Sequence, residues 1–168
     1  MTDPRWTADE ALERLYAAHW RQLVRLSVLL VRDLGTAEEV VQDAFIAVHS
    51  RWDKLHDHDR ALAYLRRAVV NQSRSTLRHR MVVARHVARG PEPGLDDEPG
   101  EVLGRRAAVL EAMRALPQRQ REVLALRYYL DLSEAEIAHT LGISRGAVKS
   151  HASRGASALR ELLRGDER

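Results

Sequence analysis

The sequence predicts an all-α protein made of two small helical domains joined by a flexible linker. Apolar residues recur at three- and four-residue steps through most of the 168 residues, which is the helical period. We find no alternating apolar and polar run and no Asn-Gly or Asp-Gly turn, so strands are not expected. Residues 90–100, GPEPGLDDEPG, hold three Pro, three Gly and four acidic residues, a composition typical of a linker. The predicted boundaries are 8–88 for the first domain, 89–101 for the linker and 102–164 for the second domain.

Composition limits the classes of function. A hydrophobic content of 45% supports a packed core, and the absence of Cys excludes disulfides, thiolate metal sites and thiol catalysis. The 27 Lys and Arg nearly balance the 24 Asp and Glu, so the position of the charges matters more than their sum. No signal-peptide core and no apolar run near the roughly 18 residues of a membrane span are present, so a cytoplasmic protein without membrane contact is expected.

The first predicted helix starts at a capping box formed by Thr7 and Glu10 and ends near Gly35. Its apolar stripe is Leu12, Leu15, Tyr16, His19, Leu23, Leu26 and Leu30. His19 is interpreted as a satisfied core or boundary histidine, because no second metal ligand lies one turn away.

The second predicted helix runs from Ala37 to about Trp52, after a capping box of Thr36 and Glu39. One face of this helix is apolar, and Val41 and Phe45 on it are assigned to the core. The other face is acidic, and exposure to solvent without any binding partner would be enough to explain its charges. Residues 53–59, DKLHDHD, are predicted to form a polar loop. A metal site at His56–Asp59 is disfavoured, because alternating ligands on a loop need further ligands and none are evident.

Residues 60–89 contain eight Arg and no Asp or Glu. Tyr64 and Asn71 interleave with these arginines along a predicted helix. Basic, aromatic and amide side chains together suit phosphate neutralisation and base stacking, so this stretch favours nucleic-acid binding. The alternative to nucleic-acid binding is that these arginines form a solvent-exposed basic face or a surface that binds an acidic protein.

The second domain is predicted to contain a helix-turn-helix. A helix at 101–116 is interrupted by Pro117, which starts a new helix bearing basic residues. Ser133 and Glu136 then form a capping box, Gly142 ends that helix, and Ser144 caps the next one. The inward positions of this last helix are Val148, Ala152, Ala156 and Leu159, which leaves a polar and basic face suited to a DNA major groove. The alternative is a solvated helical hairpin.

Three stretches resemble a known family. Residues 116–155, LPQRQREVLALRYYLDLSEAEIAHTLGISRGAVKSHASRG, are similar to the C-terminal domain of bacterial sigma factors. Residues 38–52, EEVVQDAFIAVHSRW, and 63–80, AYLRRAVVNQSRSTLRHR, are similar to their N-terminal core domain. The whole resembles the extracytoplasmic-function class of the sigma-70 family, of the actinobacterial type. The resemblance implies a non-enzymatic subunit that binds core RNA polymerase and promoter DNA and uses no cofactor, metal or small-molecule substrate. An anti-sigma factor is a further candidate partner, since many members of the family are held by one.

The resemblance also implies roles for particular residues. Core polymerase would be bound by Glu39, Gln42, Asp43 and Ile46. The −10 promoter element would be read by Tyr64, Arg67, Asn71, Arg74 and Arg78. The −35 element would be contacted by Arg145, Lys149, Ser150, His151, Ser153 and Arg154, with Arg119 and Arg121 near phosphates.

Two competing classes remain at this point. Residues 146–162, GAVKSHASRGASALREL, also resemble the helix-turn-helix of LuxR-type regulators, which would need an upstream domain of alternating strands and helices. An enzyme is the third class, but no Ser-His-Asp order, phosphate loop or metal-spaced ligand set stands out.

Overall fold

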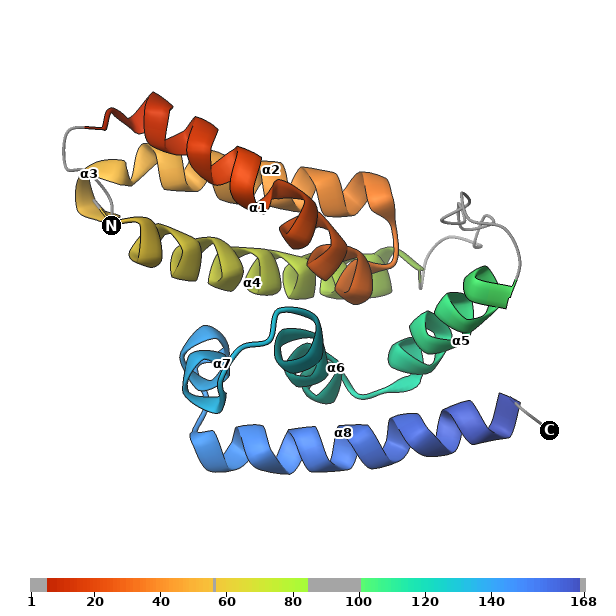
Figure 1. Cartoon of the computed structure of the whole chain (residues 1–168). Helices are drawn as coiled ribbons and strands as arrows, with labels where there is room; N and C mark the ends of the chain where they lie inside the picture. The colour runs from red at the N-terminus through yellow and green to blue at the C-terminus, as the bar shows by residue number, and fades with distance from the viewer. Residues whose placement is uncertain (1–5, 56, 85–100, 167–168) are drawn as a thin grey trace. The chain divides into compact units, whose positions relative to one another are not determined.

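The computed structural model describes residues 6–55, 57–84 and 101–166, and these residues contain helices and no strand. In order, the helices are α1 (Ala8–Val31), α2 (Leu34–Ser50), α3 (Trp52–Leu55), α4 (His58–Ala84), α5 (Glu101–Ala115), α6 (Gln118–Leu124), the π-helix η1 (Ala125–Tyr129), α7 (Glu134–Leu141) and α8 (Arg145–Asp166) (Figure 1). The all-α prediction is confirmed. The chain divides into two compact units, residues 1–93 and 94–168, called unit 1 and unit 2 below. Apart from Glu101, the predicted linker lies outside the described residues.

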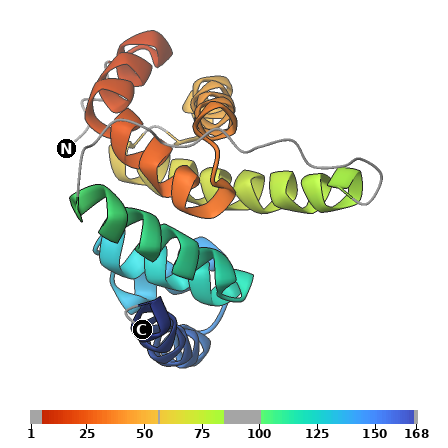
Figure 2. The same cartoon turned by 90° about the vertical axis from the view of Figure 1, so that its right-hand side faces the viewer.

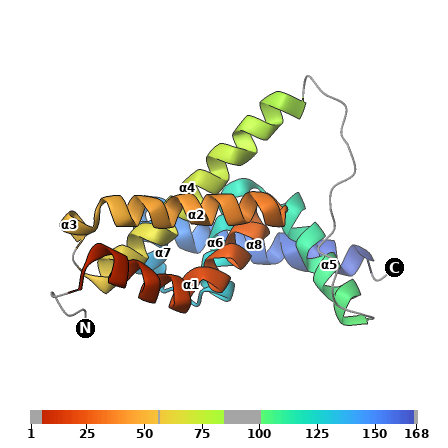
Figure 3. The same ribbon diagram turned by 90° about the horizontal axis from the view of Figure 1, so that it is seen from above.

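Unit 1 is built on three helices that contact one another pairwise: α1, α2 and α4. Helices α1 and α2 run side by side, and α4 crosses this pair at an angle (Figure 3). The buried apolar positions follow the helical period, as in Leu15, Leu23 and Leu26 of α1 and Leu65 and Val69 of α4. One polar contact lies in this core, where the buried hydroxyls of Ser27 and Ser73 are 3.1 Å apart.

The turn between α1 and α2 differs from the prediction. Helix α1 keeps its predicted Thr7–Glu10 capping box but ends at Val31, before Arg32 in the left-handed conformation at φ 70°. Asp33, rather than Thr36, then caps α2, because its carboxylate accepts a hydrogen bond of 3.1 Å from the backbone N–H of Thr36. Helix α2 therefore starts three residues earlier than expected.

Arg80 of α4 explains why Asp33 is favoured as the cap. Its guanidinium donates to Val31 O and to Asp33 Oδ2, both at 3.0 Å, and also to the hydroxyl of Thr36. The hydrogen bond from the Thr36 hydroxyl, together with the neighbouring Arg80 charge, holds the pKa of Asp33 below its ordinary value. A residue 47 positions away in sequence thus fixes this turn.

The predicted loop at 53–59 is largely helical. Residues 52–55 form the single turn α3, and α4 already begins at His58. The Asp57 carboxylate accepts from the backbone N–H of Asp59 at 2.7 Å, which caps the start of α4. Residue 56 lies outside the described residues.

Unit 2 is organised on α8, which contacts α5, α6 and α7 (Figure 2). The helix-turn-helix appears as predicted: α7 begins with the Ser133–Glu136 capping box, and Gly142 at φ 67° ends it. The Ser144 hydroxyl accepts from the backbone N–H of Ala147 at 3.1 Å and so caps α8. Val148 of α8 and Ile137 of α7 are fully buried and form part of the unit core.

The described residues contain no helix that is both long and apolar enough to cross a membrane.

Candidate nucleic-acid interface

The N-terminal half of α8 carries the exposed polar face that the sequence predicted. Val148 and Ala152 are buried and anchor α8 to unit 2. The side chains on the other side of the helix are exposed, and they are Arg145, Lys149, Ser150, Ser153 and Arg154. His151 is half-buried at the edge of this face. Cations and hydroxyls displayed along one side of a capped helix can neutralise phosphates and donate to base edges.

An acidic residue lies within this basic surface, and sequence reasoning missed it. One oxygen of the Glu134 carboxylate is 3.6 Å from Nη1 of Arg127, and the other is 3.8 Å from Nζ of Lys149. Lys149 stays largely exposed, at 69% of its side chain. Glu134 thus joins η1, α7 and α8 through one carboxylate and holds two cations on the same side of unit 2. No local spacing signals this contact, because Lys149 is fifteen positions further along the chain.

Arg121 does not lie at the surface, so its predicted phosphate contact is wrong. Only 7% of the residue is exposed, and its guanidinium donates to three backbone carbonyls at the end of α5. These are Met113 O at 2.9 Å, Arg114 O at 3.0 Å and Leu116 O at 2.9 Å. The last carbonyls of a helix have no partner within it, so a buried arginine that satisfies them is a structural anchor. Burial lowers the pKa of Arg121, and the charge of Glu122 partly offsets this effect.

Arg119, the other predicted phosphate contact of α6, is one-third exposed and pairs with Glu122 at 3.2 Å. Its role at DNA stays a prediction.

A second polar surface runs along α4. The residues predicted to read the −10 element recur at three- and four-residue steps, so they share one stripe: Tyr64, Arg67, Asn71, Arg74 and Arg78. Arg67, Asn71 and Arg78 are exposed, whereas Tyr64 and Arg74 are half-buried. The guanidinium of Arg51 lies 5.6 Å from the ring centroid of Tyr64 and adds a cation beside this aromatic side chain.

A groove of about 420 Å³ between α2 and α4 adjoins the stripe. It is lined by Asp43, Ala44, Ala47, Tyr64, Ala68, Asn71, Gln72 and Ser75. An aromatic ring and an amide therefore line one concave surface together with small side chains, and such a lining can accept a planar ring and hydrogen-bond its edge.

The predicted polymerase-binding residues lie on the outer face of α2. Glu39, Gln42 and Asp43 are exposed, and Ile46 is 55% exposed although it is apolar. Val41 and Phe45 point the other way and are buried, as predicted. An exposed isoleucine within a polar face offers apolar area that a protein partner can bury.

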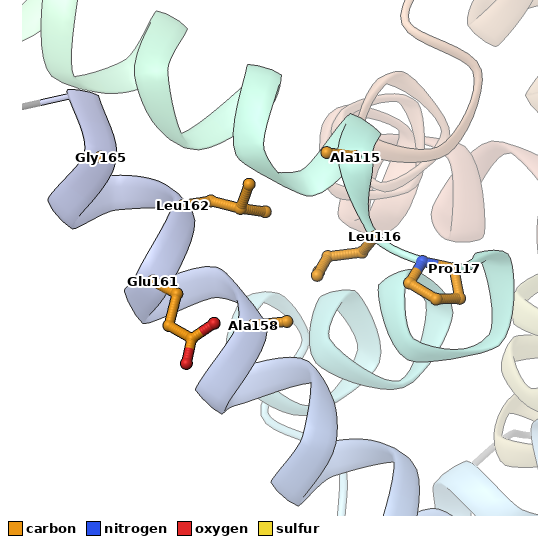
Figure 4. A pocket seen from close by; sticks show the side chains of 7 residues that line it. All are labelled: Ala115, Leu116, Pro117, Ala158, Glu161, Leu162 and Gly165. Carbon is orange, nitrogen blue, oxygen red and sulfur yellow. The ribbon is translucent and has the colours of Figure 1, made fainter.

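A further hollow, of about 550 Å³, lies in unit 2 between the end of α5 and the end of α8 (Figure 4). Its lining is mostly small or apolar, with Leu116 and Leu162 directed toward each other and Glu161 as the charged residue. Among the described residues, no group of three or more His, Asp or Glu could hold a metal ion.

Comparison with known proteins places both units in one family. Residues 15–81 match the family model for sigma-70 region 2, and residues 106–159 match the model for sigma-70, region 4. The RNA polymerase sigma-E factor of Streptomyces avermitilis is 34% identical over 141 residues, which cover 84% of this chain and 78% of the relative. The ECF RNA polymerase sigma factor SigL of Mycobacterium tuberculosis is 32% identical over 162 residues, covering 93% of this chain and 91% of the relative.

Solved structures agree with this fold. The structure of CnrH in complex with the cytosolic domain of CnrY aligns with a TM-score of 0.71 and 26% identity over 95% of this chain and 96% of that one. The sigma factor RpoE of Bartonella quintana, in complex with the anti-sigma factor NepR, aligns with a TM-score of 0.73 over 90% of this chain and 96% of that one; at 21% identity it supports the fold alone. The chain therefore belongs to the sigma-70 family of RNA polymerase sigma factors, in its extracytoplasmic-function class and of the actinobacterial type.

Proposed function

We propose that this protein binds core RNA polymerase and directs it to promoters through two DNA contacts, one from each unit. The observation that carries the proposal is the match of one unit to sigma-70 region 2 and of the other to sigma-70, region 4, in that order along the chain. Two modest contacts on one chain gain affinity because the first raises the effective concentration of the second. The role needs binding alone, so no catalytic chemistry is assigned to the chain, and it would be carried out in the cytoplasm, where RNA polymerase works.

In this proposal the α8 face recognises the −35 element. The support is its exposure and its charge: Lys149, Arg145 and Arg154 present cations beside the hydroxyls of Ser150 and Ser153. Arginine and lysine at the N-terminal part of a recognition helix reach phosphates and guanine edges in the major groove.

The α4 stripe is proposed to read the −10 element as single-stranded DNA. Tyr64 and Asn71 line the groove beside α2, and Arg67 and Arg78 are exposed along the same stripe. An unstacked base can stack on an aromatic ring and hydrogen-bond an amide while arginines hold the backbone. Preferential binding to the open strand is sufficient to favour melting.

The outer face of α2, formed by Glu39, Gln42, Asp43 and Ile46, is proposed to dock on core polymerase. Exposed carboxylates around an exposed isoleucine suit a partner surface with basic residues around an apolar patch. An anti-sigma factor is a further proposed partner, because the similar sigma factor RpoE is solved in complex with the anti-sigma factor NepR.

Run-off transcription from a promoter library, with purified core RNA polymerase, tests the function. Specific start sites that appear only when the protein is added are expected. Absence of starts together with absence of core binding would overturn the proposal. A stand-alone LuxR-type regulator would then be reconsidered, although the described part of residues 1–90 contains none of the strands that class needs.

A further inference from the structure

The groove between α2 and α4 has a carboxylate on its α2 side. Asp43 of α2 lines it together with Tyr64, Asn71, Gln72 and Ser75 of α4, and alanines of both helices complete the lining. The family resemblance assigned Asp43 only to the polymerase-binding face and gave Gln72 and Ser75 no role. The structure brings these three side chains to the concave surface on which a base is proposed to stack.

The groove residues of α4 lie beside the arginines of the same helix. With 3.6 residues per turn, the α4 residues that line the groove are centred about 80° of helix rotation from Arg67, Arg74 and Arg78. Arg67 and Arg78 are exposed. A DNA strand that lies along α4 can therefore keep its phosphates on the arginines while one of its bases turns into the groove.

We propose that Asp43 makes this groove select a base with an exocyclic amino group and reject thymine. The inference rests on the proposed function, in which α4 reads single-stranded DNA. An ionised carboxylate offers only hydrogen-bond acceptors. Cytosine, adenine and guanine each carry an amino donor, whereas thymine presents the O4 acceptor and a methyl group. A thymine O4 beside Asp43 would place two acceptors together, and both would lose water without gaining a donor.

The Asp43 carboxylate is accessible for this contact. The residue is exposed, and within the described parts of the chain no side chain forms an ion pair or a hydrogen bond with it. By contrast, Asp33 is paired with a cation. On the α4 side, the amides of Asn71 and Gln72 carry both donors and acceptors, so they can complete the edge of any base. The preference for an amino group therefore comes from the carboxylate.

Asp43 lies at the border between the groove and the outer face of α2. Glu39 and Ala47 are each four residues away, which places them about 40° to either side of Asp43. Ala47 lines the groove, whereas Glu39 is exposed on the outer face and does not line it. Glu39 is therefore the matched control, because its neutralisation changes the charge of α2 by the same amount without touching the groove.

Competition between two templates in one transcription reaction tests the inference. The reaction contains core polymerase, this protein and a promoter recovered from the library, with the −10 region held open by mismatches so that base pairing does not contribute. Each −10 base of the non-template strand is replaced in turn by its analogue without the amino group, which is purine for adenine, 2-pyrimidinone for cytosine and hypoxanthine for guanine. At one position the wild-type protein is expected to use the unmodified base about 5- to 50-fold better, and to disfavour thymine similarly.

Substitutions at Asp43 and Glu39 assign this preference. Asp43→Asn keeps the shape of the side chain but adds a donor, so the two templates are expected to be used equally and thymine to be accepted. Glu39→Gln is expected to keep the wild-type ratio. Both templates compete for the same holoenzyme, so the ratio does not depend on how tightly a variant binds core polymerase.

The outcomes separate this inference from the function on which it rests. If start sites appear but no position shows the preference, or if Asp43→Asn retains it, the role of Asp43 is wrong and the proposed function stands. If Glu39→Gln loses the preference as Asp43→Asn does, the effect belongs to the charge of α2 and not to the groove, which also overturns the inference. Absence of start sites with the wild-type protein would overturn both.

Discussion

Replacing Arg121 by Met tests whether this arginine is an internal anchor or a DNA contact. The guanidinium makes three hydrogen bonds of 2.9–3.0 Å to the carbonyls of Met113, Arg114 and Leu116. Hydrogen bonds to charged groups contribute about 1.5–3 kcal/mol each, and methionine keeps much of the buried volume without replacing them. Met113 and Leu116 are buried, but Met113 O also accepts from the backbone N–H of Leu116 and Arg114 is half-buried, so we expect a net loss of about 3–5 kcal/mol.

That loss is large for so small a unit. Domains are stable by about 0.05–0.15 kcal/mol per residue, so unit 2 would lose much of its stability. Urea unfolding of the full chain, followed by two signals, measures this. Far-ultraviolet circular dichroism reports helix content and therefore follows both units. Tryptophan fluorescence follows unit 1 alone, because unit 1 holds all three tryptophans. With a urea m-value of about 1–3 kcal/mol/M, we expect the circular dichroism transition of unit 2 to move down by about 1–5 M urea, and the fluorescence transition to stay in place.

Two results would refute this reasoning. One is a circular dichroism transition that the substitution leaves unchanged. The other is a variant that keeps its stability but binds promoter DNA with a salt dependence reduced by about one phosphate contact. The second result would restore Arg121 as a phosphate contact. Arg121→Lys provides the matched control, since it keeps the positive charge but cannot reach all three carbonyls at once.

The remaining predictions concern single charges. Lys149→Ala is expected to lower promoter affinity by about 1–3 kcal/mol without changing core polymerase affinity, measured by fluorescence anisotropy. Glu134→Gln removes the carboxylate beside Lys149 and Arg127, so non-specific DNA affinity at low salt should rise about 1.5- to 5-fold. Asp43→Arg reverses an exposed charge on α2 and is expected to weaken core polymerase binding in a pull-down titration. The lowered pKa of Asp33 means that its carboxylate stabilises unit 1 above pH 3.8 and loses this effect as the pH falls through the folded-state pKa. The stability gap between wild type and Asp33→Asn should therefore narrow below pH 3.8.

Each of these predictions has an outcome that contradicts it. If Lys149→Ala weakened promoter binding and polymerase binding equally, the proposal that α8 binds DNA would be wrong. Unchanged DNA affinity in Glu134→Gln would mean that its ion pairs do not restrain the basic surface. If Asp43→Arg left the affinity for core polymerase unaltered, the acidic face of α2 would be an ordinary solvent-exposed surface and not a docking site. For Asp33, a stability gap that is constant from pH 7 to pH 3 would refute the role of its ionised form.

The sequence alone determined the features that depend on neighbours within one helical turn. The capping boxes at Thr7 and Ser133 and the left-handed Gly142 appear where expected, because each is a contact between residues three or four apart. The exposed faces of α2 and α8 followed from the same cause, since the helical period fixes which side chains point outward once a helix forms.

Only the tertiary structure decided contacts between helices. Arg80 reaches Asp33 across 47 positions and moves the start of α2, and His58 meets His19 across 39 positions. Arg121 sits at a helical position that could have faced solvent, but three carbonyls at the end of α5 accept its hydrogen bonds and the residue is buried there. Such contacts depend on how helices pack, and packing brings together residues that no local spacing relates.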